Sequence, residues 1–171
     1  MAPQGFTFRD ATETDLPAIV AIYNATIPGR MVTADTEPVT VASRLPWFHA
    51  HNPGTRPLWV LTENGGAETI CAWLSFNSFY GRPAYAPTAE ISVYVAETHQ
   101  RCGLGRWLVH EAIARAPGCA VNTLLGFIWA HNAPSLELFV SFDFARWGYL
   151  PKVAVLDGVE RDLVIVGRRV G

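Results

Sequence analysis

The chain has 171 residues, of which 50% are hydrophobic and 16% are charged, so it can bury a sizeable core. Its formal net charge is -2, from 13 basic and 15 acidic side chains, which argues against nucleic acid as a partner. It has no apolar run of about 18 residues and no charged segment followed by an apolar run near its start, so we expect a cytoplasmic protein that does not bind membrane.

The N-terminal part of the chain is predicted to form a strand followed by two helices. Residues 6–9 alternate between aromatic and other side chains, which is typical of a strand. Thr12, with Asp15 three residues later, has the spacing of a helix N-cap with a capping box. A second helix is predicted over residues 40–51, and Pro46 within it is expected to kink or split it.

The rest of the chain alternates strands with helices, separated by glycine and proline turns. Asn64, Gly65 and Gly66 have the composition of a hairpin turn. The predicted strands cover residues 58–63, 68–76, 88–95, 123–128, 145–150 and 163–168, and the predicted helices cover residues 104–116 and 132–142. This order predicts an α/β fold, and since no linker or repeat interrupts it, we expect a single domain over residues 1–171.

The turn between the strand at 88–95 and the helix at 104–116 carries the strongest functional signal. Gly103 and Gly105 let the backbone come close to a ligand, and the first N–H groups of a helix lack intrahelical partners. Such a turn favours phosphate binding. It is not a Walker A loop, because no Lys-Ser/Thr pair follows Gly105, and Leu108 stands where a dinucleotide fingerprint has its third glycine. A plain strand-to-helix turn is the structural alternative.

The run Gln100-Arg101-Cys102-Gly103-Leu104-Gly105 resembles the Gln/Arg-x-x-Gly-x-Gly/Ala signature of the GNAT acyltransferases. The resemblance implies that backbone N–H groups from Arg101 to Arg106 hold the pyrophosphate of acetyl-CoA. The predicted element order is also that of the GNAT fold over nearly the whole chain. It implies a mixed central sheet of about seven strands flanked by about four helices.

Within this superfamily the chain is similar to the phosphinothricin acetyltransferases and the methionine sulfone/sulfoximine acetyltransferases. The segments that carry this similarity are residues 79–85, 88–95, 99–101, 132–135 and 157–163. The similarity implies an N-acetyltransferase that moves the acetyl group of acetyl-CoA to the α-amine of a small amino acid or analogue, by direct attack in a ternary complex. Members of the group are usually homodimers, so a homodimer is expected.

The resemblance also implies roles for individual residues. Glu90 becomes the general base, and a weak base acting through water suffices because a free α-amine loses its proton near pH 8. The pantetheine and thioester are expected to contact Val93, Tyr94 and Val95, and the pantetheine arm is expected to contact Asn132 and Ser135. The pyrophosphate is expected to contact Gln100, Arg101, Cys102, Gly103, Leu104, Gly105 and Arg106. The acceptor substrate is expected to contact Tyr80, Arg82 and Tyr85.

Several of these residues have structural alternatives. Glu90 could be a strand carboxylate in an ion pair. Asn132 and Ser135 could form a helix N-cap, a role compatible with ligand contact. Arg82 has the bidentate donors that suit a substrate carboxylate, but it could equally be a solvated loop arginine.

The chain departs from the family at Phe139, where many members have a Tyr or His that protonates the departing CoA. A phenylalanine has no proton to give. A thiol with a pKa of about 8.5 still leaves tolerably as thiolate, so the loss need not abolish transfer. Tyr149 or a water molecule could replace the missing acid.

Phe139 keeps open a non-catalytic acyl-CoA-binding regulatory module as an alternative to an enzyme. A peptide or protein N-terminal acetyltransferase with the same donor is a second alternative, which an open, acidic acceptor groove would favour. No metal is predicted, because neither the histidines nor the cysteines have a metal-binding spacing. Cys71, Cys102 and Cys119 are expected to be free thiols, as in a reducing compartment.

Overall fold

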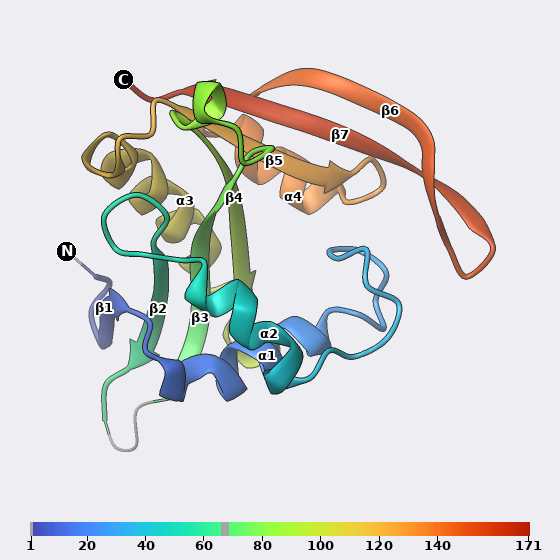
Figure 1. The fold of residues 1–171 in the computed structure, drawn as a ribbon. Coiled ribbons are helices and arrows are strands. Elements are labelled where there is room, and N and C mark those ends of the chain that lie inside the picture. Colours follow the sequence, from blue (N-terminus) through green and yellow to red (C-terminus); the bar gives the residue numbers. More distant parts are fainter. Residues whose placement is uncertain (1, 66–68) are drawn as a thin grey trace.

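The structure is a computed structural model that describes residues 2–65 and 69–171 (Figure 1). Within these residues there are seven strands and four α-helices, in the α/β order that the sequence predicts. The strands are β1 (Phe6–Asp10), β2 (Leu58–Glu63), β3 (Thr69–Ser78), β4 (Thr88–Val95), β5 (Thr123–Trp129), β6 (Ala145–Leu156) and β7 (Val159–Arg169). The helices are α1 (Leu16–Ala25), α2 (Val41–His49), α3 (Leu104–Arg115) and α4 (Ala133–Val140). Short 3-10 turns are η1 (Glu13–Asp15), η2 (Pro83–Tyr85), η3 (Glu97–His99) and η4 (Ala116–Cys119).

The strands form one mixed sheet in the order β1-β2-β3-β4-β5-β7-β6. All neighbours are antiparallel except β4 and β5, which are parallel. Their pairing runs only from Thr88↔Thr123 to Glu90↔Leu125. Beyond that point β4 continues to Val95 and β5 to Trp129, and Figure 1 shows the two strands diverging. The sheet therefore opens into a V in its middle.

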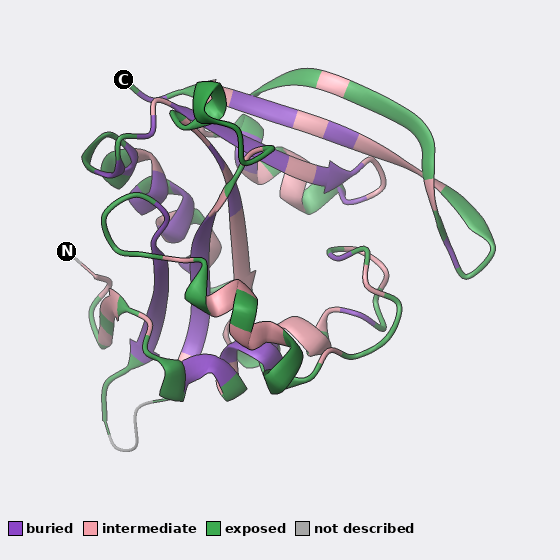
Figure 2. Ribbon diagram, viewed as in Figure 1, coloured by how far each residue is buried: buried purple, intermediate pink, exposed green. Residues whose placement is uncertain are grey.

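Helices cover both faces of this sheet (Figures 1 and 2). On one face, Ile19 and Ile22 of α1 pack with Leu58, Val60 and Trp73, and α2 adds Trp47 and Phe48. On the other face, α3 and α4 pack against the opposite sides of the same strands, with Leu108, Val109 and Phe139 in that core. Strands β2, β3 and β5 are buried on both faces over most of their length, and their sequences are largely apolar.

The capping box predicted at Thr12 and Asp15 forms at the 3-10 turn η1, which leads directly into α1. The backbone N–H of Thr12 donates to the Asp15 carboxylate at 2.7 Å, and Arg9 donates to the same carboxylate at 2.7 Å. These contacts satisfy a helix-start donor and fix the turn between β1 and α1.

Of the two predicted effects of Pro46, a kink or a split of the second helix, the split is wrong, because α2 runs unsplit from Val41 to His49. A helical proline leaves the carbonyl four residues earlier without its bond. Here that residue is Ala42, which is exposed and can bond to water, so the loss is tolerated. The predicted hairpin turn and the start of its second strand fall partly on residues 66–68, outside the described residues.

The hairpin of β6 and β7 is longer than predicted, since β6 reaches Leu156 and β7 begins at Val159. The predicted strand stops at Leu150, directly before Pro151. In the structure, a register shift between Leu150 and Ala154 absorbs it, and β6 is an edge strand. A proline is accepted at a bulge or on an edge because no ladder N–H is needed there. The hairpin projects as an arm beyond the rest of the fold (Figure 1).

Among the described residues, no helix is both long enough and apolar enough to cross a membrane. Cys71, Cys102 and Cys119 are free thiols, as predicted.

Candidate active site

A cleft of about 410 Å³ lies where β4 and β5 separate. Its walls come from α1, α2, the loop between them, strands β3 to β5 and the start of α4. Past Glu90 and Leu125, the facing edges of β4 and β5 have no strand partner among the described residues. The Val95 carbonyl accepts from the Gln100 amide and the Trp129 carbonyl accepts from the Asn132 N–H, and the remaining backbone groups on these edges can bind a ligand. Val93 and Tyr94, both predicted to contact a cofactor, line this cleft.

Glu90 is the last β4 residue that pairs with β5, and it lines the cleft. Within the described part of the chain its carboxylate makes no hydrogen bond and no ion pair. Burial raises the pKa of Glu90 above its ordinary value. The ion-pair alternative for Glu90 is therefore not what the structure shows. A half-buried carboxylate without a partner, in a cleft, has the setting of a general base.

Aromatic side chains form the wall beside Glu90. Tyr94 stacks on Trp73 with ring centroids 4.3 Å apart, and Tyr23 lies 5.3 Å from Tyr94. Trp47 packs edge-on against Trp73 at 5.8 Å and donates to Asn77 at 3.1 Å. Burial also raises the pKa of Tyr94, which keeps its hydroxyl protonated. This wall excludes water from one side of the cleft.

Arg44 of α2 is a cleft residue that the sequence analysis missed. It is the one Lys or Arg among the described residues that line the cleft. One guanidinium nitrogen donates to Asp35 at 2.8 Å, and the group lies 4.7 Å above the Tyr23 ring. Its other donors have no hydrogen-bond partner among the described residues, so they can bind an anionic group. No sequence signal marks Arg44, since its position depends on how α2 and residues 26–40 fold back over the sheet.

The loop of residues 26–40 closes one side of the cleft. The Trp129 indole donates to the Thr33 carbonyl at 3.3 Å, and the Asn132 amide donates to the Met31 carbonyl at 2.8 Å. Farther along, Arg30 forms an ion pair with Asp157 at the tip of the β6–β7 arm, at 2.8 Å. These contacts hold the loop against β5, the start of α4 and the arm.

The predicted phosphate turn has the expected backbone shape. Gly103, at φ 82°, is the N-cap of α3, and Arg101 also has a positive φ of 60°. The backbone N–H groups from Arg101 to Arg106 have no partner among the described residues, so they are available to an anion. Leu104 is buried in the core and anchors the turn.

The side chains of Gln100, Cys102 and Arg106 each contact a different group. The Gln100 amide lies 3.4 Å from the Val95 carbonyl, and the Cys102 thiol lies 3.4 Å from the Gln100 carbonyl. Arg106 donates to Ser141 at 2.9 Å and lies over the Phe142 ring, so its guanidinium faces α4. The contribution of Arg106 to an anion site is therefore best assigned to its backbone N–H.

Asn132 and Ser135 form the helix N-cap that the sequence allows. The Asn132 side-chain oxygen accepts from the Ser135 N–H at 3.2 Å. Both residues also line the cleft, so capping and ligand contact are compatible. The Ser135 hydroxyl has no hydrogen bond to another described residue.

The structure does not bring Tyr80, Arg82 and Tyr85 to the Glu90 cleft of the same chain. Arg82 and Tyr85 line a separate hollow of about 530 Å³, and Tyr80 is 77% exposed. Arg56 explains this placement, because it donates to the carbonyls of Ala86 and Thr88 at 2.7 and 3.2 Å. These bonds hold the loop of residues 79–87 away from the V between β4 and β5.

Phe139 is buried, lines the cleft and packs against Phe144 with centroids 4.9 Å apart. It offers no proton at this position. The hydroxyl of Tyr149, the suggested replacement, donates to Asp162 on the exposed arm and does not line the cleft. Within one chain, Tyr149 is therefore not the missing acid.

Comparison with known proteins identifies close relatives of the chain. The sequence profile of the acetyltransferase (GNAT) family matches residues 19–144. YwnH of Bacillus subtilis (strain 168), named as a candidate phosphinothricin acetyltransferase, is 49% identical over 95% of this chain and 98% of its own length. The L-methionine sulfoximine/L-methionine sulfone acetyltransferase of Salmonella typhimurium is 31% identical over 94% of this chain and 92% of its own length.

A solved structure supports the same relationship. The structure of yncA from Salmonella typhimurium, named as a candidate acetyltransferase and solved with its cofactor acetyl-CoA, superposes with a TM-score of 0.88. It is 30% identical, and the match covers 98% of this chain and 95% of that one.

The two glycines of the phosphate turn should respond to alanine in opposite ways. Gly103→Ala should lower the free energy of unfolding by about 1–2 kcal/mol, because φ 82° strains an L side chain. Gly105→Ala should leave it unchanged or raise it by up to about 1 kcal/mol, since Gly105 is helical and its Cβ would lie 3.7 Å from Leu138. Urea unfolding of both variants measures this. Equal effects would contradict the assigned turn geometry.

Proposed function

The chain belongs to the acetyltransferase (GNAT) family, and from this premise we propose that it acetylates the α-amine of a small amino acid or amino-acid analogue. GNAT acetyltransferases use acetyl-CoA as donor. The acceptors named for its relatives are phosphinothricin and methionine sulfoximine or sulfone. The observation that carries the proposal is that one carboxylate, Glu90, and one guanidinium, Arg44, line the same cleft and form no ion pair with each other. An amino acid has the complementary pair, an amine and a carboxylate.

Glu90 acts as the general base in this proposal. The acceptor amine must be neutral to attack the thioester carbonyl, and near neutral pH removing its proton costs only about 1 kcal/mol. Glu90, directly or through a water molecule, takes that proton. Its lack of an ion-pair partner among the described residues leaves both carboxylate oxygens available.

The open edge of β4 positions the donor. Backbone groups of Val93, Tyr94 and Val95 run from Glu90 to the phosphate turn, so one extended molecule can contact both. A backbone N–H on this edge stabilises the negative charge that develops on the carbonyl oxygen during attack. The free N–H groups from Arg101 to Arg106 hold the pyrophosphate, and Ser135 supplies a free hydroxyl for the pantetheine arm. Acetyl-CoA supplies the acetyl group as a thioester, and Phe139 is consistent with a leaving group that departs as thiolate.

Arg44 is our candidate for the acceptor carboxylate. It replaces Arg82 in that role within one chain, because Arg82 does not line the Glu90 cleft. The closure of the cleft by residues 26–40 favours a small acceptor over a long peptide. Tyr80, Arg82 and Tyr85 can act on an acceptor only from a second copy of the chain or after movement of their loop.

We propose that two copies of the chain form a homodimer through the β6–β7 arm. Its outer strand β6 is a sheet edge and carries Trp147, Tyr149, Leu150, Val153 and Val155, which are 39–60% exposed. An edge strand with this much exposed apolar area tends to pair with another chain. A second copy provides a surface of the same kind, as two-fold symmetry requires.

The first experiment measures CoA release with a thiol-reactive dye, using acetyl-CoA and a panel of amino acids, their sulfone and sulfoximine analogues, phosphinothricin and short peptides. Turnover with one amino-acid class is expected. Turnover with peptides alone would favour an N-terminal acetyltransferase. Acetyl-CoA binding without turnover on any acceptor would favour the non-catalytic alternative.

Glu90→Gln should lower kcat at pH 7 by roughly 100-fold or more and leave the Kd for acetyl-CoA unchanged, because only proton removal is lost. In the wild type, burial raises the pKa of Glu90, so kcat/KM should fall on the acid side with a midpoint above the ordinary 4.5. The exposed Glu137→Gln on α4 is the matched control and should keep full activity. An unchanged kcat in Glu90→Gln would refute the assignment.

Glu90→Gln should also be more stable than the wild type at neutral pH. A carboxyl whose pKa is higher in the folded chain loses stability as pH rises, because the folded state disfavours its charged form. Below about pH 3 the carboxyl is uncharged in both the folded and the unfolded chain, so the stability difference between wild type and variant should vanish. Thermal unfolding of the wild type and of Glu90→Gln, at neutral pH and at the acidic pH, tests this.

Arg44→Ala should raise the KM for an acceptor amino acid about ten-fold or more and leave the KM for acetyl-CoA unchanged. This rise in KM should disappear when the acceptor is the corresponding amino-acid amide, which has no carboxylate to bind. Arg82→Ala is the matched comparison and should have the smaller effect. A larger rise in KM for Arg82→Ala than for Arg44→Ala would instead place the carboxylate site on the loop of residues 79–87 of a second chain.

The combined variant Val153→Lys, Val155→Lys should be monomeric in light scattering at concentrations where the wild type is a dimer, since it places charges on the proposed interface. Val140→Lys, on α4 and also exposed, should leave the dimer intact. A monomeric wild type at micromolar concentration would contradict the proposed homodimer.

A further inference from the structure

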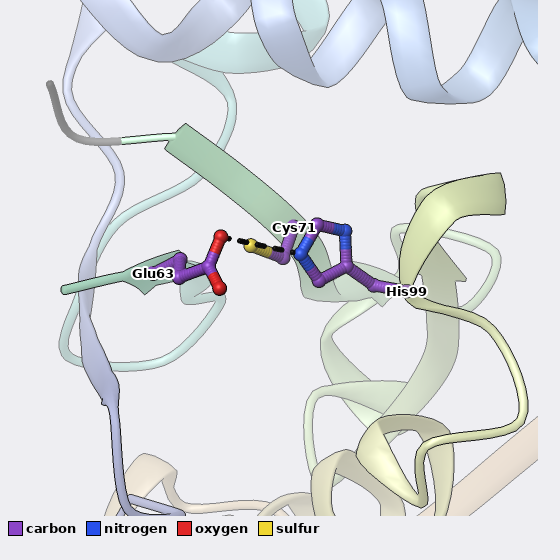
Figure 3. A group of neighbouring side chains, drawn as sticks. All are labelled: Glu63, Cys71 and His99. Atoms are coloured by element: carbon purple, nitrogen blue, oxygen red, sulfur yellow. Dashed lines mark ion pairs between the residues drawn. The ribbon is translucent and has the colours of Figure 1, made fainter. Parts of the chain in front are cut away.

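A second chemical cluster lies outside the cleft, at the end of β2, the start of β3 and the turn η3. It consists of Glu63, Cys71 and His99 (Figure 3). One potential ligand atom from each, a carboxylate oxygen, the thiol sulfur and an imidazole nitrogen, lies within 4.8 Å of the others. Cys71 is fully buried, and the side chains of His99 and Glu63 are 20% and 53% exposed. The cluster therefore has one buried end and one end open to solvent.

A β-bulge directs Cys71 into this cluster. The register of β2 and β3 passes from Leu61↔Ala72 to Thr62↔Ile70, which leaves Cys71 as the extra residue on β3. A bulge re-aims the side chain of its extra residue, and bulges gather near functional sites. The Cys71 backbone carbonyl also accepts a hydrogen bond from Ala96 at 2.7 Å, just before η3. This bond extends the β3–β4 pairing by one residue and places the bulge beside the turn that carries His99.

The imidazole of His99 is oriented like that of a metal ligand. Its Nδ1 lies 2.8 Å from the hydroxyl of Thr98, and its Nε2 lies 3.5 Å from the Glu63 carboxylate. When Nδ1–H donates to Thr98, the lone pair of Nε2 faces Glu63. Metal-binding histidines are commonly fixed through a hydrogen bond of the second ring nitrogen.

The spacing of Nε2 and the carboxylate also fits a shared cation better than a direct bond. An N–H···O hydrogen bond spans about 2.7–3.2 Å, shorter than the 3.5 Å found here. A nitrogen and an oxygen ligand of one tetrahedral zinc ion, each about 2.0–2.2 Å from the metal, lie roughly 3.3–3.6 Å apart. The Cys71 thiol, which donates to the Thr69 carbonyl at 3.3 Å, must leave that carbonyl and turn toward the other two ligands to complete three corners of such a tetrahedron.

We propose that Glu63, Cys71 and His99 form a binding site for one divalent zinc ion, with water in the fourth position on the exposed side. Thiolate, imidazole and carboxylate together are a donor set that zinc accepts and that magnesium and calcium do not. On binding, the Cys71 S–H bond breaks, the sulfur bonds to zinc as thiolate and the proton passes to solvent. Without metal the thiol stays neutral, because burial and the nearby Glu63 raise the pKa of Cys71.

The site would tie the β2–β3 end of the sheet to the phosphate turn. His99 is the last residue of η3, and Gln100 follows it directly. A metal that fixes His99 to β2 and β3 restrains the start of that turn. The zinc site itself does not depend on the proposed acetyl transfer, and its test needs no activity measurement.

The test is zinc titration of the purified, chelator-treated full-length protein against a chromogenic competing chelator. We expect one zinc ion per chain, a rise in Tm with zinc, and a near-ultraviolet sulfur-to-metal absorption band when cobalt replaces zinc. Cys71→Ala and His99→Gln should each weaken zinc binding at least ten-fold, and Cys71→Ala should abolish the cobalt band.

Cys102→Ser is the matched control, because Cys102 is the exposed thiol and the one best placed for adventitious zinc binding. It should keep the wild-type affinity and the cobalt band. His99→Gln, at a partly exposed position, provides the test if Cys71→Ala fails to fold. Absence of stoichiometric zinc binding, or binding that survives His99→Gln but is lost in Cys102→Ser, would overturn the proposal.

Discussion

The short parallel pairing of β4 with β5 is the constraint on which the site depends. Three register pairs join the strands, and beyond Glu90 and Leu125 they diverge. A continuous ladder would satisfy the facing backbone groups and leave no space between the strands. Because each strand keeps an antiparallel partner on its other side, β3 for β4 and β7 for β5, the sheet stays intact while its centre opens. The V therefore provides a cleft and free backbone polar groups at the same place.

The two faces of the sheet contribute different parts of this site. On the face of α1 and α2, Trp73, Tyr94 and Trp47 form an aromatic wall, and Arg44 brings a positive charge to it. On the other face, α3 begins at the phosphate turn and α4 begins at Asn132. Helix α4 begins just after β5, and α3 begins just after the turn that follows β4, so both start beside the V. The aromatic wall with Arg44 and the starts of α3 and α4 thus belong to different helical layers.

Glu90 shows how this site departs from what stability alone favours. Its carboxylate is half-buried, has no partner among the described residues, and has a raised pKa because of burial. Such a group costs stability at neutral pH, and the chain offsets that cost with apolar packing on both faces of the sheet. The loop of residues 26–40 adds polar contacts to Trp129 and Asn132 that keep the cleft closed on one side.

The sequence by itself determined the features that depend on neighbouring residues. The bounds of β4, the glycine-bearing turn before α3, the Asn132–Ser135 cap and the cleft position of Glu90 follow from local periodicity, turn composition and resemblance. Only the tertiary structure decided the features that depend on distant segments. Arg44 reaches the cleft because α2 folds over the sheet, and Arg82 is kept from it because Arg56 binds its loop. Glu63, Cys71 and His99 meet because a bulge and a turn bring three separate segments together, and no spacing along the chain encodes that meeting.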